Sequence, residues 1–169
     1  MGFPAPRKLE RGDRREDFGS GADDLDLWFA QFAWENQQAG NAVTYVVADD
    51  DGLMLGYYSI TMASVGRLTV PERLQKGRPN QVPCVLLARL AVRRDRQGSG
   101  LGRRLLADAL RRAAFQSDAI GAAAVLVHCR DEAAKAFYLA NADFLESPAD
   151  PLHLLLPMKD LKRVLQSAP

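Results

Sequence analysis

The sequence has few of the residues that build disulfide frameworks or metal sites. Only two cysteines and two histidines occur among its 169 residues, and they do not follow the ligand spacing of a zinc site. Cys84 and Cys129 each lie inside an apolar run, where a free cysteine usually behaves as a small buried hydrophobic side chain. We therefore expect neither a disulfide nor a metal site.

Long apolar runs are missing as well. No stretch approaches the roughly 18 to 20 uninterrupted apolar residues that a membrane-spanning helix needs. Residues 1–17 carry too many charges for a secretory signal peptide. The sequence thus predicts a protein that has no membrane partner and works in the cytoplasm.

The chain also lacks a strong overall charge, because its net charge is only +1. The distribution is uneven: residues 67–112 contain 12 basic and 3 acidic side chains, whereas residues 1–66 contain 5 and 11. Such a basic segment is either a solvated face or a surface for a polyanion, such as coenzyme phosphates or nucleic acid. Both interpretations stay open at this point.

Hydrophobic periodicity predicts a single domain over residues 1–169, since no repeat or linker divides the chain. Residues 1–20 are expected to be irregular, with Phe3, Leu9 and Phe18 docking on the body. The element order indicates a mixed-sheet α/β (α+β) fold with a central strand–helix–strand crossover. The expected elements are a helix over 23–40 capped by Asp23 or Asp24, strands over 42–48 and 53–64 joined by a turn at 49–52, a short turn of helix within 66–81, a strand over 82–92 buried on both faces, a helix over 100–115, a strand over 122–129, a helix over 132–141 capped by Asp131, a strand over 152–156, and a terminal turn of helix over 158–165.

A glycine-rich run, Gln97-Gly98-Ser99-Gly100-Leu101-Gly102, lies between a predicted buried strand and a predicted helix. A loop in this position presents free backbone N–H groups and the positive end of the helix dipole to an anion. Glycine lets a phosphate approach the backbone closely and tolerates positive φ. The arginines that surround the loop could neutralise further phosphate charge; they are Arg93, Arg94, Arg96, Arg103 and Arg104.

Other glycine-rich sites fit less well. A P-loop needs Gly-Lys-Ser/Thr, which is absent, and a dinucleotide fingerprint needs Gly-x-Gly-x-x-Gly early in the chain with an acidic residue about 20 positions later. A purely structural glycine turn stays open.

The run follows Leu-Ala-Arg-Leu-Ala-Val at 87–92, and the two together resemble the Gln/Arg-x-x-Gly-x-Gly motif of the GCN5-related N-acetyltransferases (GNAT) and its preceding strand. Ala136-Phe137-Tyr138 also matches that family. The resemblance implies acetyl-CoA as cosubstrate and a central mixed sheet of about six to seven strands flanked by about four helices. It further implies Tyr138 as the acid that protonates the departing thiolate, a pantetheine site at Leu90, Ala91 and Val92, and a pyrophosphate site at Gln97, Gly98, Ser99, Gly100, Leu101, Gly102 and Arg103.

A narrower resemblance, to the acetyltransferase toxins of bacterial toxin–antitoxin pairs, covers nearly the whole chain. It implies acetylation of the α-amino group of aminoacyl-tRNA and neutralisation by a ribbon-helix-helix antitoxin; a homodimer stays open. The chain departs from the usual pattern at Phe18-Gly19-Ser20-Gly21 and at Asp143-Phe144, which affects local loop shape. The residues that carry the resemblance are Leu25-Asp26-Leu27-Trp28, Gln37, Gly56-Tyr57-Tyr58, the strand over 86–92 and His128.

The expected reaction is direct attack of a neutral amine on the thioester, with oxyanion stabilisation by a backbone N–H near Ala91 or Val92. Tyr138 is either the general acid or an ordinary core residue. An α-amino group has a pKa of about 7.7 to 8.0, so a general base is dispensable. His128 is either a base or water-holding residue or, more in keeping with a buried strand, a satisfied structural histidine. Trp28, Phe29 and Phe32 are expected mainly as core residues and secondarily as a wall of the substrate site. Glu35, Asp131 and Glu132 are weaker candidates for the general base.

Coenzyme phosphates cannot use all twelve basic groups of the central segment, so some are candidates for holding tRNA phosphates. These are Arg67, Arg73, Lys76 and Arg78, together with Arg93 beside the loop. Two alternatives stay open: acetylation of a small-molecule or protein amine, which an acidic first third would suit, and a non-catalytic partner-binding module.

Overall fold

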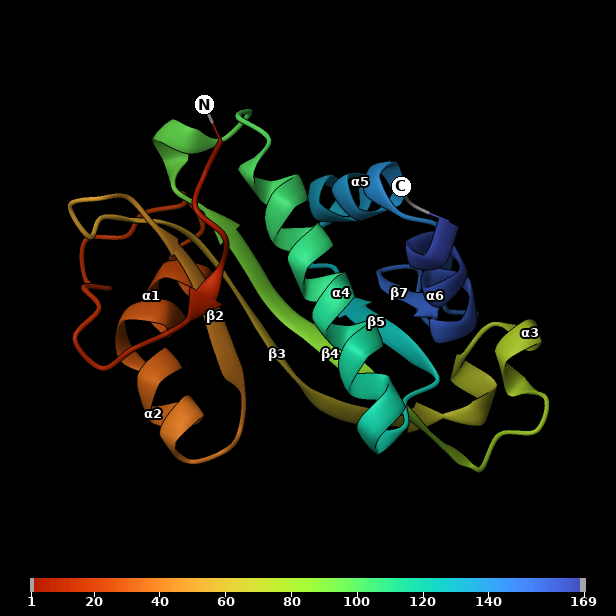
Figure 1. The fold of residues 1–169 in the computed structure, drawn as a ribbon. Coiled ribbons are helices and arrows are strands. Elements are labelled where there is room, and N and C mark those ends of the chain that lie inside the picture. The colour runs from red at the N-terminus through yellow and green to blue at the C-terminus, as the bar shows by residue number, and fades with distance from the viewer. Residues whose placement is uncertain (1, 168–169) are drawn as a thin grey trace. The chain divides into compact units, whose positions relative to one another are not determined.

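The computed structural model describes residues 2–167, and within them seven strands form one sheet in the order β1-β2-β3-β4-β5-β7-β6. Strands β4 and β5 are parallel and the other registered pairs are antiparallel, which confirms the mixed sheet and its strand–helix–strand crossover. The elements are β1 (Arg7–Lys8), α1 (Asp23–Gln31), α2 (Ala33–Gln38), β2 (Val43–Ala48), β3 (Met54–Gly66), α3 (Glu72–Gln75), β4 (Gln81–Val92), α4 (Leu101–Ile120), β5 (Ala124–His128), α5 (Glu132–Asn141), β6 (Leu145–Glu146), β7 (His153–Pro157) and α6 (Met158–Ser167), with 3-10 turns at Arg67–Thr69 and Arg94–Arg96 (Figure 1).

The chain divides into two compact units. Unit 1 comprises the chain up to Thr61 together with Ala88–Ala109, and unit 2 comprises Met62–Leu87 and the chain from Leu110 onward. Among the described residues, no helix is both long and apolar enough to cross a membrane.

Unit 1 is built around the antiparallel strands β1, β2 and β3, with α1 and α2 packed on one face (Figure 1). The Tyr57 ring lies at the centre of this core, and its hydroxyl donates to the Leu25 carbonyl at 2.7 Å. Leu9 and Phe18 are buried in the same core, as expected from the sequence. The buried core residues of the unit are Leu9, Phe18, Phe29, Ala33, Val46, Met54, Tyr57 and Ala91.

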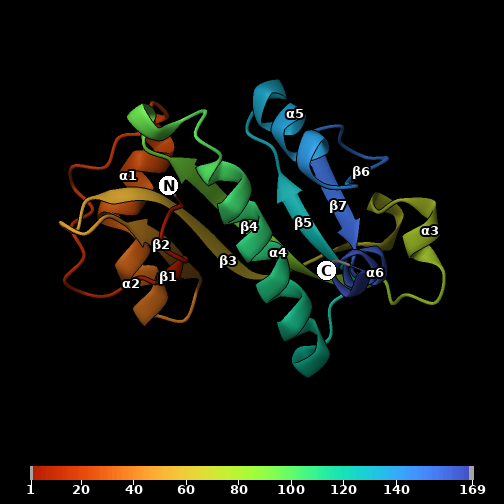
Figure 2. The same ribbon diagram turned by 45° about the horizontal axis from the view of Figure 1, so that its top comes forward.

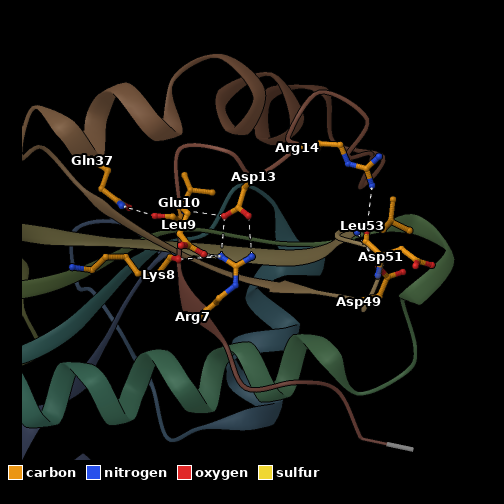
Figure 3. A network of polar contacts seen from close by, with 10 residues as sticks. All are labelled: Arg7, Lys8, Leu9, Glu10, Asp13, Arg14, Gln37, Asp49, Asp51 and Leu53. Atoms are coloured by element: carbon orange, nitrogen blue, oxygen red, sulfur yellow. Dashed lines mark hydrogen bonds and ion pairs between the residues drawn. The ribbon is translucent and has the colours of Figure 1, made fainter.

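The N-terminal segment is less irregular than expected, because Arg7 and Lys8 pair with Val46 and Tyr45 and so add strand β1 to the sheet. The Arg7 guanidinium donates to both carboxylate oxygens of Asp13 at 2.9 Å (Figure 3). The amide of Gln37 donates to the Leu9 carbonyl at 2.9 Å and accepts from the Thr44 N–H at 2.9 Å. A two-residue strand has too little periodicity to be visible in a sequence.

The expected helix over 23–40 is broken into α1 and α2 at Phe32, whose φ of −123° is not helical. Its N-cap is Ala22, not Asp23 or Asp24, and Ala22 makes no side-chain cap. The acidic residues instead occupy the first turn, where their charge is favourable toward the helix dipole. The extra break, together with the short α3 and the regular α6, gives six helices in the described chain rather than about four.

In unit 2, β7 lies between β5 and β6 (Figure 2), and β6 is a two-residue strand that the sequence did not predict. The side chain of Asp131 accepts from the Ala134 N–H at 2.8 Å, which confirms the expected cap of α5. Helix α4 runs five residues beyond the expected end, to Ile120, and Gly121 follows it with a φ of +78°. Both cysteines are free and buried, as expected. A buried hydrophobic cluster of this unit contains Val70, Leu74, Val82, Cys84, Ala123, Ala124, Leu126 and Leu155.

Strand β4 is only partly the doubly buried strand that its apolar run suggested. Consecutive residues Cys84 and Val85 are buried, whereas Leu86 and residues 88–90 are half-buried. The later residues of β4 therefore keep accessible surface.

Gly56 of β3 sets how closely the first turns of α4 approach the sheet. A Cβ atom at this position would lie 2.9 Å from Cδ1 of Leu105, 3.1 Å from the Ala91 carbonyl oxygen and 3.2 Å from Cδ2 of Leu101. An added methyl group would crowd both leucine side chains and the Ala91 carbonyl, so glycine at this position lets the start of α4 pack closely on the sheet.

We expect Gly56→Ala to lower the free energy of unfolding by about 1–3 kcal/mol, because the added methyl group overpacks this contact. Gly66→Ala on the same strand is the control, since its Cβ would meet nothing nearer than Cγ2 of Thr69 at 3.7 Å. Urea unfolding of both variants measures the difference. Equal stability of the two variants would contradict the role of Gly56.

Candidate active site

The glycines of the loop between β4 and α4 are required by its backbone conformation. Gly98 and Gly100 have φ angles of +79° and +89°, which L side chains rarely adopt. A Cβ atom at either position would meet nothing within 4 Å, so lack of space is not the reason for glycine. Gly102 lies in the first turn of α4.

This conformation leaves a row of backbone N–H groups open. Ser99 donates to the Arg96 carbonyl at 3.3 Å, and Arg104 donates to the Gly100 carbonyl at 3.2 Å. Within residues 2–167, no protein acceptor faces the backbone N–H groups of Gly98, Gly100, Leu101, Gly102 or Arg103. The first turn of this 20-residue helix also carries no acidic side chain. The open N–H groups and the helix dipole together suit a phosphate.

Gln97 and Arg93 fasten the start of the loop. The Gln97 side-chain amide donates to the Val92 carbonyl at 3.0 Å and to the Ser20 carbonyl at 2.7 Å. The Arg93 guanidinium donates through Nε to the Met54 carbonyl at 3.1 Å and through Nη2 to the Asp17 carbonyl at 3.2 Å. Both side chains, expected from sequence as ligands for phosphate, therefore also anchor the loop to its own unit.

The segment Gly19–Gly21, where the chain departs from the toxin pattern, is joined to the loop by hydrogen bonds. The Gly19 carbonyl accepts from the Arg94 N–H at 2.9 Å, and the Ser20 hydroxyl donates to the Asp26 carboxylate at 2.6 Å. Sequence reasoning missed Ser20 and Asp26 as parts of the site, because their contribution depends on contacts with residues about 70 positions away.

The last residues of β4 lie beyond its ladder with β5. That ladder pairs Cys84–Leu87 with Ala124–Val127, and β4 then continues to Val92. Leu90 and Val92 are half-buried on one face and Ala91 is buried on the other. This stretch, expected to hold the pantetheine arm, thus ends at the glycine loop.

Tyr138 lies in unit 2, on α5, and its side chain is only 7% exposed. Its ring meets Phe137 and Phe144 edge to face at 5.2 and 5.8 Å. Burial raises the pKa of the phenol above its usual value, and among the described residues the hydroxyl has no hydrogen-bond partner. Tyr138 therefore keeps its proton at neutral pH and has it free to donate.

His128 is exposed at the end of β5, whose other residues are buried. Its ring stacks on that of His153 at 4.0 Å, and His153 Nε2 lies 3.5 Å from Asp150. Partial burial under this stack, and then the neighbouring His153, lower the pKa of His128. The imidazole is therefore neutral at pH 7.

The basic residues of the central segment differ in what they contact. Arg73 forms an ion pair with Asp160 at 2.9 Å, and Arg67 donates to the Arg78 carbonyl at 3.1 Å. Lys76 is exposed just after α3. Unit 2 thus brings Arg73, Lys76 and Arg78 together around α3, while Arg93 belongs to unit 1.

These features agree with the comparisons with known proteins. The acetyltransferase (GNAT) family model matches residues 5–144, so the chain belongs to this family and is an N-acetyltransferase that uses acetyl-CoA. It is 40% identical over 164 residues to a tRNA-acetylating toxin of Mycobacterium tuberculosis, covering 97% of this chain and 98% of that protein. It is 30% identical over 169 residues to a probable toxin TacT of Sinorhizobium fredii, covering 95% and 93%. The crystal structure of AtaTR bound with AcCoA superposes with a TM-score of 0.81 at 25% identity, covering 95% of this chain and 97% of that one.

We expect Gly100→Ala to weaken acetyl-CoA binding about tenfold or more, since a side chain would pull the loop out of its positive φ and misplace charge-assisted N–H donors. Isothermal titration with acetyl-CoA measures this.

Gly121→Ala is the matched control, because Gly121 has a φ of +78° at the other end of α4 and a Cβ there also meets nothing within 4 Å. Both variants should lose about 1–2 kcal/mol of stability from backbone strain. Equal acetyl-CoA affinity in the two variants would exclude the loop as the coenzyme site.

Proposed function

We propose that the protein transfers the acetyl group of acetyl-CoA to the α-amino group of aminoacyl-tRNA and thereby blocks translation. The observation that carries this proposal is 40% identity, over 97% of the chain, to a tRNA-acetylating toxin. The open N–H groups of Gly98 and of residues 100–103 support the coenzyme half of the reaction. The basic segment over 67–112 supports the polyanionic second substrate.

In this proposal, the backbone of the glycine loop holds the pyrophosphate of the coenzyme, with the exposed Arg103 beside it. Leu90, Ala91 and Val92 line the pantetheine arm. A backbone N–H near Ala91 or Val92 donates to the oxyanion that develops when the amine attacks the thioester carbonyl.

Tyr138 acts as the general acid. The neutral amine forms the amide bond as the carbon–sulfur bond breaks. The nitrogen releases one proton to water, and the phenol supplies a proton to the leaving sulfur. Burial supports this role, because the raised pKa keeps the phenol protonated until a stronger base forms beside it.

The acceptor amine needs little help to lose its proton. An α-amine with a pKa of about 7.7 to 8.0 is roughly one-tenth neutral at pH 7, whereas a lysine amine at about 10.4 is almost wholly protonated. The chemistry therefore favours an α-amine over a lysine side chain as the acceptor.

Arg73, Lys76, Arg78 and Arg93 are proposed to contact tRNA phosphates. The Arg73 side chain stays 56% exposed in its ion pair with Asp160, so it can still meet an anion. We further propose that a ribbon-helix-helix antitoxin neutralises the protein, and that it acts in the cytoplasm, where aminoacyl-tRNA is used.

The direct test incubates the enzyme with labelled acetyl-CoA and charged total tRNA. Label should enter the charged tRNA and leave with the aminoacyl group after mild alkali. Deacylated tRNA and formylmethionyl-tRNA, which lack a free α-amine, are the controls. Labelling of a polyamine or of protein lysines in preference to charged tRNA would contradict the proposal.

Tyr138→Phe removes only the hydroxyl from a buried ring, so we expect it to fold and bind acetyl-CoA while turnover falls about 100-fold or more. Tyr45→Phe, on β2 and outside the proposed site, is the control.

The wild-type rate should rise with pH through about pH 8, as the α-amine loses its proton. It should show no alkaline decrease at pH values up to about 10, because the acid keeps its proton there. Unchanged turnover in Tyr138→Phe, or an alkaline fall well below pH 10, would contradict the role of Tyr138.

A further inference from the structure

An arginine on β4 that the reaction does not yet use lies against an aromatic cluster of unit 1. The Cζ atom of Arg89 is 4.1 Å from the centroid of the Trp28 ring. The Trp28 ring is nearly parallel to that of Tyr57, at 6.2 Å and 17°, and Tyr57 is nearly parallel to Phe29, at 4.3 Å and 7°. Tyr57 and Phe29 are fully buried, so they hold Trp28 and Arg89 in a fixed orientation.

The charge of Arg89 is poorly compensated by the chain. Within residues 2–167 its guanidinium makes no hydrogen bond and no ion pair; Asp24 acts on it only at longer range. The side chain is half-buried, and a cation that loses water without gaining a partner is costly. Partial burial accordingly lowers the pKa of Arg89, although a guanidinium stays charged.

Two other arginines of the unit have hydrogen-bond partners within it. Arg7 holds the Asp13 carboxylate with two hydrogen bonds, and Arg93 donates to two backbone carbonyls. Arg15 and Arg89 are both half-buried, and neither guanidinium has all its donors paired within the described part of unit 1. The Nε and Nη1 atoms of Arg15 are buried, whereas Arg89 has no buried unpaired nitrogen and lies over the Trp28 ring. A planar guanidinium that is stacked on tryptophan and has open donors is the arrangement that binds phosphate in a fixed plane.

The position of Arg89 connects it to the reaction. It lies one residue before Leu90–Val92, the stretch proposed to hold the thioester, and its side chain shares a strand face with Ala91. That face is covered by α1, whose Trp28 is half-buried and is followed one turn later by Phe32, 43% exposed. Phe32 is therefore not a core residue, contrary to expectation, and with Trp28 it forms an accessible aromatic edge beside an unpaired cation.

Resting on the proposed function, we propose that Arg89, stacked on Trp28, binds the phosphate that precedes the terminal adenosine of aminoacyl-tRNA, with the aromatic edge of Trp28 and Phe32 receiving the unstacked adenine. An amino acid on tRNA is an ester of that adenosine, so its α-amine lies within one nucleotide of this phosphate. Single-stranded RNA ends are recognised in this way, by aromatic and guanidinium stacking together with phosphate contacts. Arg89 is thus a positioning residue for the acceptor amine.

The test uses Arg89→Gln and Arg89→Lys, with Arg11→Gln as the matched control, because Arg11 also lies over a tryptophan, Trp34, at 5.7 Å in the same unit. For Arg89→Gln we expect the KM for aminoacyl-tRNA to rise about tenfold or more, through loss of a charge-assisted contact. The slope of log KM against log salt should fall by about one unit. Arg89→Lys should recover part of the loss, and acetyl-CoA affinity, kcat and melting temperature should stay at the wild-type values.

A neutral methylphosphonate in place of the last phosphodiester of the tRNA tests the same contact from the RNA side, and the measurement on wild-type enzyme needs no variant. It should raise the KM of wild-type enzyme and of Arg11→Gln, and leave that of Arg89→Gln unchanged. An unchanged KM for wild-type enzyme on this RNA would overturn the proposal, as would a loss of acetyl-CoA affinity equal to the loss of tRNA affinity in Arg89→Gln. Failure of the proposed function is distinguishable, because wild-type enzyme would then acetylate no charged tRNA at all.

Discussion

The open backbone N–H groups at the start of α4 are the constraint on which the site depends. A loop that satisfied its own donors would bind no phosphate, and a loop of L side chains could not hold the positive φ angles of Gly98 and Gly100. Five amides of this turn therefore make no hydrogen bond within residues 2–167 and are available to a ligand. The position of these amides, rather than any side chain, defines the coenzyme site.

The rest of unit 1 keeps this unsatisfied turn in place. Gly56 lets Leu101 and Leu105 approach the sheet, which sets the depth of the helix start. Gln97 bridges the end of β4 and the Ser20 carbonyl, and Arg93 reaches back to β3. Side chains that look like phosphate ligands in the sequence therefore also act as anchors, whereas Arg89, which lies over Trp28, makes no hydrogen bond or ion pair among the described residues.

The sequence predicts well what depends on local pattern. Alternating and periodic apolar residues located the main strands and helices, Asp131 was recognised as a cap, and the glycine loop was placed between β4 and α4. It predicts poorly what depends on distant contacts. Strand β1 is too short to show periodicity, the break at Phe32 leaves the apolar spacing almost unchanged, and the stacking of Arg89 on Trp28 joins residues 61 positions apart. Exposure of His128 and Phe32 also followed from packing that no local pattern records.

Backbone amide NMR during titration shows whether the amides of Gly98 and residues 100–103 bind the coenzyme pyrophosphate. With coenzyme A, the resonances of Gly98, Gly100, Leu101, Gly102 and Arg103 should shift strongly, because each N–H gains an anionic acceptor. With pantetheine, which lacks the pyrophosphate, the same resonances should stay near their free positions. Equal shifts with both ligands, or shifts with coenzyme A confined to other parts of the chain, would contradict the account.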